Sequence, residues 1–468
     1  MSGTLMGLPF IDGCVFILYL VALVAVGVYF SKKVESAKDF SSAGQRLTVP
    51  VIMGSVMASW FGAFTGSGAP GSIWETGLVM GTTFLGYHVG LLIMGLMAKQ
   101  MRETGALTYP DFIAYQFGDV ARMPTAIASL LTLLGTCAGQ FVACGTMLSL
   151  LGVCSFNTGI ILGGTIILIL TISGGLFGVA MTDTIQQVFI TVICVIAVPI
   201  VAFHNAGGVS FVFENTDPAK LSWFTGMPAA ALIAAFAGNA LAFATDPAFA
   251  QRVFAAKDTK SASLGINGGN IVCIFMEFAI WFSVFTMPFL FPELNDGSRF
   301  VASVIIEFMP PIIKGLGIAA FSSLLITTGD TYLLTMSSVL MTDIYPKIKK
   351  NITDRQVLVG GRVAALIVGL FSMAIGLWLQ NIMSAITLFY GAYGSAVTVP
   401  VLLSCSKKIR DFMNGKVVAA GIFITLFVTA AIDLWGGMRY GVFVGVGLNI
   451  IICLVGSAIF KKDTNKEA

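Results

Sequence analysis

Apolar runs of about 20 residues follow one another along almost the whole chain, with short polar segments between them. A helix needs a run of this length to cross roughly 30 Å of hydrocarbon, where lipid offers no partner for backbone N–H and C=O groups. Of the 468 residues, 57% are hydrophobic and only 10% are charged, a composition that a water-soluble chain of this size would not tolerate. The sequence therefore predicts an all-α polytopic membrane protein in a lipid bilayer.

The boundaries of the runs predict about 13 transmembrane helices. The first run is followed directly by Lys32 and Lys33 and has no convincing cleavage site, so it is predicted to be a retained helix and not a signal peptide. The predicted spans lie at approximately 11–31, 49–72, 77–98, 123–150, 156–175, 178–203, 223–249, 263–291, 315–341, 357–379, 382–404, 417–435 and 440–460.

The Lys and Arg residues are unevenly distributed between the spans. If the N-terminus lies outside, all 26 of them fall in inner segments except Lys220, Arg299, Lys314 and Arg439. The positive-inside rule then predicts a multi-pass protein of a bacterial-type plasma (inner) membrane, with its N-terminus outside and its C-terminus in the cytoplasm. Because membrane orientation explains the basic segments, no nucleic-acid partner is predicted.

Two of the predicted spans contain residues that interrupt a helix. Residues 60–71 read WFGAFTGSGAPG, and residues 236–252 read FAGNALAFATDPAFAQR. Non-helical backbone at membrane depth is tolerated only where protein or a water-filled cavity satisfies it, so each interruption indicates a buried site. Close helix packing through small residues is the alternative. The glycines and proline favour a break in the first span, and both readings stay open for the second.

The positions of the interrupted spans indicate an internal repeat. If the first span is set aside, they begin two consecutive groups of five, a pattern typical of inverted-repeat secondary transporters with a site at the breaks. The sequence therefore predicts a five-plus-five core with one helix before it and two after it. The expected divisions are 1–48 (an extra helix and inner loop), 49–203 and 204–416 (the two repeats) and 417–468 (two helices and a short tail).

Three carboxylates fall inside predicted spans, where ionisable groups are costly and usually functional. Asp183 lies near the start of its span, so it is either a site residue or a helix cap at the inner interface. Glu277 has no polar neighbours in sequence and is predicted to pair with another helix. Asp330 lies in the stretch SSLLITTGDTYLLTMSS, residues 322–338.

That stretch gathers oxygen donors on one side of a helix. At about 100° per residue, Leu324, Thr327, Thr328, Asp330 and Thr331 fall within an arc of roughly 160°. Hydroxyls, a carboxylate and freed backbone carbonyls are the ligands that a small hard cation prefers. The alternative is that each hydroxyl bonds back to a carbonyl of its own helix. An adjacent threonine pair opposite a broken helix favours cation binding.

Six motifs occur along the chain in an order that resembles the sodium/solute symporter family: AKDFSSAGQ, ASWFGAFTGSGAPG, TYPDFIAYQFGD, GGLFGVAMTDTIQ, DPAFAQRVFAAKD and TTGDTYLLTMSSVLMTDIYPK. The resemblance covers nearly the whole chain. It implies the inverted-repeat fold of leucine-type transporters, a transporter and not an enzyme, and sodium as the bound ion without an organic cofactor.

The resemblance also implies which residues bind ions. A sodium site would be formed by the backbone carbonyls of Ala58, Phe61 and Leu324 with the hydroxyls of Thr327 and Thr328. Some members of the family have a second sodium site, whose matching positions here are Asp183, Thr327, Asp330 and Thr331.

The solute is less well defined than the ion. The ASWFG motif resembles that of members whose site has aromatic character, including choline-type ones. Ordinary helix packing is the alternative for each lining residue taken alone. The predicted substrate-lining residues are Trp60, Phe61, Phe64 and Thr65 at the first break, Tyr87 and His88 from the third span, and Asn239 and Phe243 from the seventh.

The predicted function is sodium-driven uptake of a small polar organic solute, such as an amino acid or a betaine- or choline-like molecule, by alternating access. A single chain holds the whole predicted site, so a monomer suffices. One alternative is proton coupling through Asp183 or Asp330, and another is a transporter-like sensor. An intramembrane enzyme is the weakest, because His88 and His204 are the only histidines and neither sits in a catalytic or metal-binding pattern.

Overall fold

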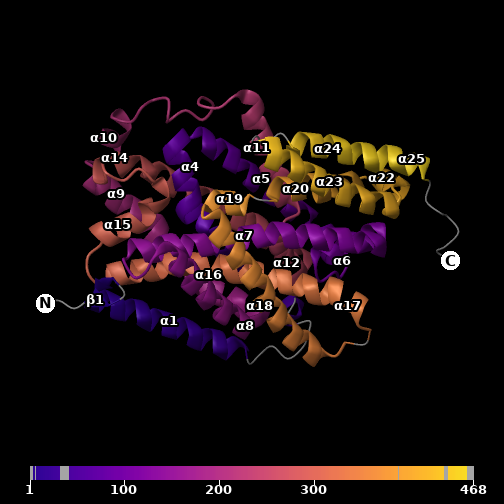
Figure 1. Ribbon diagram of the computed structural model, residues 1–468, viewed down its shortest axis with the longest axis horizontal. Helices are drawn as coiled ribbons and strands as arrows, with labels where there is room; N and C mark the ends of the chain where they lie inside the picture. Colours follow the sequence, from indigo (N-terminus) through magenta and orange to yellow (C-terminus); the bar gives the residue numbers. More distant parts are fainter. Residues whose placement is uncertain are drawn as a thin grey trace.

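The computed structural model describes residues 4–5, 7–31, 39, 42–350, 352–387, 389–436 and 441–460. Seven of the Lys and Arg residues counted for the predicted orientation lie outside these ranges: Lys32, Lys33, Lys38, Arg439, Lys461, Lys462 and Lys466. Long helices such as α1, α7, α16 and α24 run broadly along the long axis of the molecule (Figure 1). The strands in the described part of the chain are β1 (Thr4–Leu5) and β2 (Leu8–Pro9), a short antiparallel pair before α1.

The described residues up to Glu214 form thirteen helical elements. They are α1 Phe10–Ser31, η1 Ala43–Gln45, α3 Val49–Trp60, η2 Phe64–Gly68, α4 Ala69–Thr76, α5 Val79–Glu103, α6 Tyr109–Phe117, η3 Asp119–Ala121, α7 Arg122–Leu150, α8 Phe156–Phe189, η4 Ile190–Ala197, α9 Val198–Asn205 and α10 Val209–Glu214.

The second half continues from α11. Its elements are α11 Ala229–Ala244, α12 Pro247–Ala255, α13 Thr259–Ser283, η5 Val284–Thr286, α14 Met287–Leu290, η6 Gly297–Arg299, α15 Phe300–Phe308, α16 Ile313–Val339, η7 Leu340–Ile344, α17 Tyr345–Ile348, α18 Asp354–Leu379, α19 Ile382–Ile386, α20 Tyr390–Tyr393, η8 Gly394–Thr398, α21 Val399–Ser404, α22 Lys407–Phe412, α23 Gly415–Gly436, α24 Gly441–Ile451, η9 Ile452–Gly456 and α25 Ser457–Ile459.

The described residues contain 11 helices that are long and apolar enough to span a membrane, or 12 if one bent pair counts as a span. The prediction of a helical membrane protein is therefore confirmed. The structure differs from the predicted division between 156–175 and 178–203, because α8 runs through both without a loop. No proline or charged residue occurs between Phe156 and Thr182 to end that helix. Within α8, Phe156–Ile172 is a shorter apolar segment.

Both predicted interruptions are present. The first falls between α3 and η2, where the two parts of the span are bent by 45°. The second falls at Thr245 and Asp246, between α11 and α12. The alternative of close packing also holds for α11, because a Cβ placed on Gly90 of α5 would lie 2.3 Å from the carbonyl oxygen of Ala240. The second span is thus tightly packed along α11 and broken at its end.

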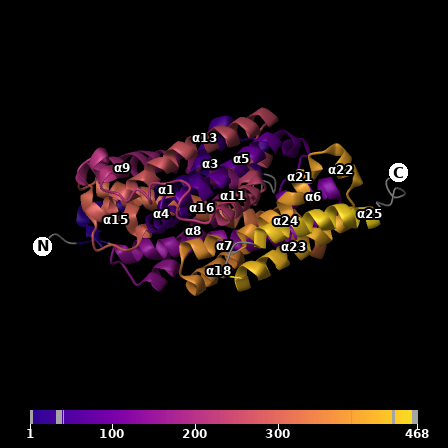
Figure 2. The ribbon, with the colours of Figure 1, turned by 90° about the horizontal axis from the view of Figure 1, so that it is seen from above.

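Helix α16 lies in the middle of the bundle in two perpendicular views (Figures 1 and 2). Every residue from Gly317 to Val339 is buried, and α16 packs against α1, α3, α7, α8 and α18. A helix surrounded by protein on all sides does not need a lipid-compatible surface, so it can carry hydroxyls and a carboxylate at this depth. This explains why the polar stretch at 322–338 is stable inside the membrane.

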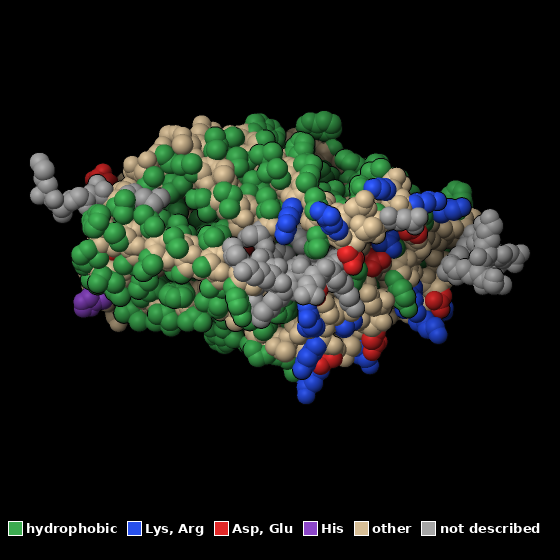
Figure 3. Space-filling view, turned by 90° about the horizontal axis from the view of Figure 1, so that it is seen from below, with side chains coloured by type: hydrophobic (Ala, Val, Ile, Leu, Met, Phe, Trp, Pro, Cys, Tyr) green, Lys and Arg blue, Asp and Glu red, His purple; other side chains and the backbone are tan. Residues whose placement is uncertain are grey.

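Charged side chains gather at one end of the molecule. Lys and Arg cluster toward the right of Figure 3, the end at which α6, α17 and α22 lie in Figure 1, whereas the rest of that face is mostly hydrophobic. At this end Arg122 contacts both Asp111 (2.7 Å) and Asp343 (2.8 Å), and Lys347 contacts Asp119. β1, before α1, and α25 lie at opposite ends of the molecule (Figure 1).

Candidate functional site

Oxygen atoms of α16 and α3 converge where α3 ends. We call this group the threonine cluster: Thr327, Thr328 and the backbone carbonyls of Ala58, Ser59 and Leu324. Thr327 Oγ1 donates to the Ala58 carbonyl at 2.9 Å and lies 3.4 Å from the Leu324 carbonyl. Thr328 Oγ1 lies 3.2 Å from the carbonyls of both Ser59 and Leu324. The structure therefore brings together four of the five predicted sodium ligands.

The backbone at the break is satisfied by protein groups. Phe61, the fifth predicted ligand, ends α3 with φ −80° and ψ 72°, and its N–H donates to the Met57 carbonyl. The N–H of Ala63 donates to Oε1 of Gln140 on α7 at 2.7 Å. A Cβ added to Gly62 would lie 2.5 Å from the Thr328 hydroxyl oxygen, so the close approach of α3 to α16 requires glycine. Protein thus satisfies non-helical backbone at membrane depth.

A second polar group joins the same two helices to α8 and α12. We call it the arginine cluster: Arg252, Asp183, Ser55, Ser59 and Thr331. Arg252 Nη2 donates to the hydroxyls of Ser59 and Thr331, both at 2.7 Å, and lies 3.7 Å from Oδ2 of Asp183. Asp183 also accepts from Ser55 at 2.9 Å. Arg252 is only 1% exposed, so a buried guanidinium contacts two residues of the predicted second sodium site.

Asp330, the remaining member of that predicted site, lines a different cavity. Its Oδ1 is buried and has no hydrogen-bond partner among the described residues. The cavity measures about 20 Å³ and is also lined by Leu23, Gly27, Leu170, Gly178, Val179, Thr182, Gln186 and Ile326. Asp330 lies outside the hydrogen bonds of the arginine cluster, yet its carboxylate is close enough to interact electrostatically with Asp183 and Arg252.

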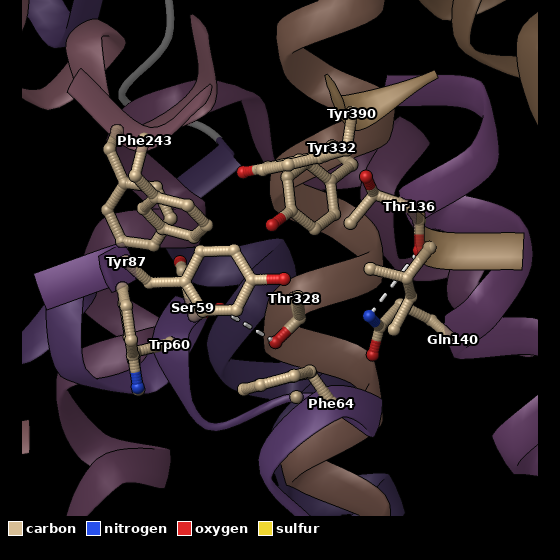
Figure 4. Close-up of a pocket in the computed structure, with 13 residues that line it drawn as sticks. Ser59, Trp60, Phe64, Tyr87, Thr136, Gln140, Phe243, Thr328, Tyr332 and Tyr390 are labelled. Atoms are coloured by element: carbon tan, nitrogen blue, oxygen red, sulfur yellow. Dashed lines mark hydrogen bonds between the residues drawn. The ribbon is translucent and has the colours of Figure 1, made fainter. Parts of the chain in front are cut away.

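A cavity of about 40 Å³ lies beside the threonine cluster (Figure 4). Trp60, Tyr87 and Phe243 lie on one side of it, and Thr136 and Gln140 lie opposite. Aromatic rings make up much of the wall: the ring centroids of Trp60 and Phe243 are 4.9 Å apart, as are those of Tyr87 and Phe243. The lining residues are Ser59, Trp60, Gly62, Phe64, Tyr87, Thr136, Gln140, Phe243, Phe249, Thr328, Tyr332, Ile386 and Tyr390.

Four predicted substrate residues, Trp60, Phe64, Tyr87 and Phe243, are among those that line this cavity. The other four are Phe61, Thr65, His88 and Asn239, and they lie elsewhere. Phe61 is fully buried at the end of α3. Asn239 donates to the Thr83 carbonyl at 2.8 Å and faces a separate cavity of about 320 Å³.

Thr65 and His88 contact Glu277 instead of the cavity. Thr65 Oγ1 lies 3.0 Å from the Trp60 carbonyl and 3.2 Å from Glu277 Oε1. His88 Nε2 lies 2.9 Å from Glu277 Oε2. The prediction that Glu277 pairs with another helix is confirmed, and its partners lie on three elements: α3, η2 and α5.

Several lining residues were missed because they come from segments far apart in sequence. Gln140 is the one amide side chain of α7, a signal that could have identified it. Tyr332 lies one position after Thr331 on the polar stretch of α16, and Tyr390 lies inside the predicted span 382–404. Arg252 was counted among the inner basic residues, which hid its role as a buried partner of Asp183.

Comparison with known proteins identifies the family of the chain. A family model described as the sodium:solute symporter family matches residues 40–411. The chain belongs to the sodium:solute symporter family. It is a transporter of the sodium-symport class and not an enzyme. Both predictions from the sequence motifs are confirmed.

Characterised relatives extend over nearly the same length. The chain is 25% identical to the sodium/sialic acid symporter NanT of Aliivibrio fischeri, over 96% of this chain and 93% of that one. It is 24% identical to the osmoregulated proline transporter OpuE of Bacillus subtilis, over 95% and 94%.

Two solved structures share the fold. One is a Na⁺-coupled sialic acid symporter in a substrate-bound outward-open state, with a TM-score of 0.84, 21% identity and coverage of 98% of this chain and 99% of that one. The other is Mhp1, a nucleobase-cation-symport-1 family transporter in a closed conformation, with a TM-score of 0.56, 14% identity and coverage of 90% and 95%. The described helices therefore have the fold of sodium- and cation-coupled transporters.

Proposed function

We propose that this transporter imports a small polar organic solute together with sodium, and that sodium binds in the threonine cluster. The observation that carries the proposal is the position of Thr327 and Thr328, whose hydroxyls face the carbonyls of Ala58, Ser59 and Leu324 at the end of a broken helix. All of these donors are neutral oxygens, the ligands that suit a small hard cation.

Sodium bound there would connect α16 to α3. The two hydroxyls now donate to carbonyls, and each also has lone pairs that can turn toward a cation. The carbonyl of Phe61 at the break completes the proposed ligand set. Sodium would stabilise whichever conformation holds the two helices together, and coupling to the solute follows from the difference in sodium affinity between conformations. An inward sodium gradient and the membrane potential, about 2.3 kcal/mol per charge per 100 mV, would drive uptake.

The second predicted sodium site is proposed only for a conformation in which Arg252 has moved. Arg252 now donates to Thr331 and lies beside Asp183, so its positive charge repels a second cation from those oxygens. Withdrawal of the guanidinium would leave Asp183, Thr331, Thr327 and Asp330 available. Sodium binding at this place is thus conditional on movement of α12.

The solute is proposed to bind in the aromatic cavity. Trp60, Tyr87, Phe243 and Tyr390 present ring faces, which attract ammonium groups, while Gln140 can fix a polar end. This chemistry suits an amino acid or a betaine- or choline-like solute. At about 40 Å³ the cavity is far smaller than the roughly 300 Å³ or more of typical ligand sites, so solute entry requires the rings to separate.

The finer architecture is also proposed. The breaks at the ends of α3 and α11 support two five-helix repeats, 49–203 and 204–416, preceded by 1–48 and followed by 417–468. The proposed count of about 13 spans takes the bent pair of α3 and α4 as one span and the apolar segments Phe156–Ile172 and Leu176–Asn205 as two. The charged end in Figure 3 supports a cytoplasmic position for α6, α17 and α22, which places the start of α1 outside.

The experiment is uptake into proteoliposomes with and without an inward sodium gradient. A thermal-shift screen of amino acids, betaines, sugars and carboxylates, with proline and sialic acid included, first identifies the solute by comparing sodium with potassium. We expect one solute to stabilise the protein only in sodium and to accumulate only under a sodium gradient. Accumulation that is indifferent to sodium would overturn the proposal.

A further inference from the structure

A buried ionisable pair lies behind the wall of the cavity. His88 Nε2 of α5 and Glu277 Oε2 of α13 are 2.9 Å apart, and the two side chains are 3% and 0% exposed. Neither residue belongs to the threonine cluster or to the arginine cluster. A buried pair with no role in the proposed sodium site requires an explanation of its own.

The protonation of this pair follows from its third partner. Asn270 Nδ2 donates to the backbone carbonyl of His88 at 2.9 Å, and a carbonyl can only accept. This contact fixes the amide orientation, so Asn270 Oδ1 is the atom that faces His88 Nδ1 at 2.7 Å. An amide oxygen is also only an acceptor. Nδ1 of His88 must therefore carry a hydrogen.

We propose that His88 and Glu277 together form a proton-binding site. With hydrogen on Nδ1, a neutral His88 would present a lone pair at Nε2 to an ionised Glu277 carboxylate 2.9 Å away, and two acceptors at that distance repel. One more proton, taken from water, resolves the contact. It lies on Nε2 of an imidazolium or on Oε2 of a carboxylic acid, and either arrangement gives a hydrogen bond.

This proton connects directly to the cavity through Trp60. Trp60 Nε1 donates to Glu277 Oε1 at 2.7 Å, and its ring centroid lies 4.5 Å from that of His88. The same Trp60 ring forms one wall of the aromatic cavity. Loss of the proton would push Glu277 away from His88 and displace the anchor of Trp60. Proton occupancy therefore holds Trp60 in the closed form of the cavity.

Few other charged groups act on the pair. Among the elements packed against α13, α3 and η2 have no charged side chain, and the guanidinium on α12 is held by the arginine cluster. Glu75 of α4, Lys99 and Glu103 of α5, His204 of α9 and Lys260 of α13 are exposed, and Arg102 at the end of α5 donates to the Ala256 carbonyl. The remaining titratable groups on these elements are the buried phenol of Tyr87 on α5 and the buried thiols Cys273 of α13 and Cys194 of η4. The pair thus exchanges its proton largely independently of other ionisable side chains.

The direct test is nitrogen NMR of histidine, because the chain has only two histidines. The full chain is labelled at the imidazole nitrogens, placed in nanodiscs, and compared with His204→Gln, which assigns the signals. We expect His88 to keep a hydrogen on Nδ1 at neutral pH, with Nε2 either protonated or accepting a strong hydrogen bond. A neutral His88 with hydrogen on Nε2 and none on Nδ1 would overturn the proposal.

Glu277→Gln provides a second test that does not depend on spectroscopy. Its amide can donate to Nε2 of His88 and accept from Trp60, so it copies the protonated pair without a titrating proton. Above about pH 6.5 the histidine and the carboxylate of the unfolded chain have both lost their protons. The folded wild type still holds one proton on the pair. A folded pair that keeps this proton therefore loses stability relative to the unfolded chain as the pH rises.

We expect the thermal midpoint of the wild type to fall relative to that of Glu277→Gln between pH 6 and 9. Glu307→Gln, at an exposed glutamate of α15, is the matched control and should follow the wild type. Parallel curves for wild type and Glu277→Gln would contradict the proposal.

Trp60→Phe should shift the pH at which the His88 signal changes, whereas Trp378→Phe, at a 73% exposed tryptophan, should not. Equal behaviour of the two tryptophan variants would remove the link to the cavity.

Discussion

The threonine cluster and the arginine cluster lie side by side between α3 and α16, yet they differ in charge. Ser59 belongs to both: its carbonyl faces Thr328, and its hydroxyl accepts from Arg252. In the threonine cluster every donor is a neutral oxygen. In the arginine cluster, a guanidinium already fills the position between Asp183 and Thr331.

The difference shows that the residues of α16 do not determine alone where a cation binds. Hydroxyls at successive turns of one helix look equivalent in sequence, but α12 supplies a positive charge to one group only. The positive charge of Arg252 balances the negative charge of Asp183. The oxygens that have no positive group beside them are those of the threonine cluster, around Thr327 and Thr328. A change in either cluster should therefore have a distinct effect: on stability for the arginine cluster, and on sodium affinity for the threonine cluster.

Arg252→Met should have the largest effect. It leaves Asp183 as a buried unpaired charge and removes a donor from Ser59 and Thr331, a loss of about 3–5 kcal/mol of unfolding free energy. Denaturation of the purified protein in detergent measures it. The double variant with Asp183→Asn should recover much of the loss, because it removes the unpaired charge as well. A cost below about 1 kcal/mol for the single variant would show that the ion pair is not structural.

Thr328→Val should come next, with its effect on sodium. The substitution keeps the shape and removes the hydroxyl, and the loss of one ligand to a charged group is worth about 1.5–3 kcal/mol, or roughly 10- to 100-fold in sodium affinity. Sodium titrations followed by thermal shift give the affinity. Thr328→Ser keeps the oxygen and should stay near wild type, as should Thr165→Val, a control at an exposed threonine of α8. Unchanged sodium affinity in Thr328→Val would count against the threonine cluster.

Gln140→Leu tests the break that both clusters share. It leaves the buried N–H of Ala63 without its acceptor, a cost of about 1–3 kcal/mol. Gln140→Glu keeps an acceptor oxygen for the N–H of Ala63 and should therefore destabilise the break less than Gln140→Leu does. Thermal or chemical unfolding distinguishes them, and equal stability of Gln140→Leu and wild type would mean that Ala63 finds another partner.

Asp330→Asn should have the smallest effect. Asp330 faces a small cavity beside α1 and α8, outside both clusters, so sodium affinity should stay within about twofold of wild type. The same sodium titration checks this expectation. A tenfold loss would place Asp330 among the cation ligands and would favour the second site or a proton-coupled mechanism.

Much of the fold and part of the site could be predicted from sequence because local signals carried them. The glycines and proline after Trp60 marked the first break, and the adjacent hydroxyls of Thr327 and Thr328 marked the polar face of α16. Contacts between distant segments carried no such signal. Gln140 caps the break from α7, and Arg252 reaches Asp183 from α12, so their roles depend on helix packing that no periodicity encodes.

The residues around the cavity show the same limit. Thr65 at the first break and His88 on the third span were predicted to line a substrate site, but their side chains turn toward Glu277. The rotation of a helix about its own axis decides whether a residue faces a cavity or a neighbouring helix. Apolar runs do not fix that rotation, because each helix is apolar on several sides.

Equilibrium binding of radioactive sodium tests the central claim most directly. The full chain in detergent, without solute, is compared with the double variant Thr327→Val and Thr328→Val, in which Arg252 is unchanged. We predict saturable sodium binding to the wild type, displaced by unlabelled sodium but not by potassium, and its loss in the double variant. Sodium binding of equal affinity in both proteins would contradict the assignment of the ion to the threonine cluster.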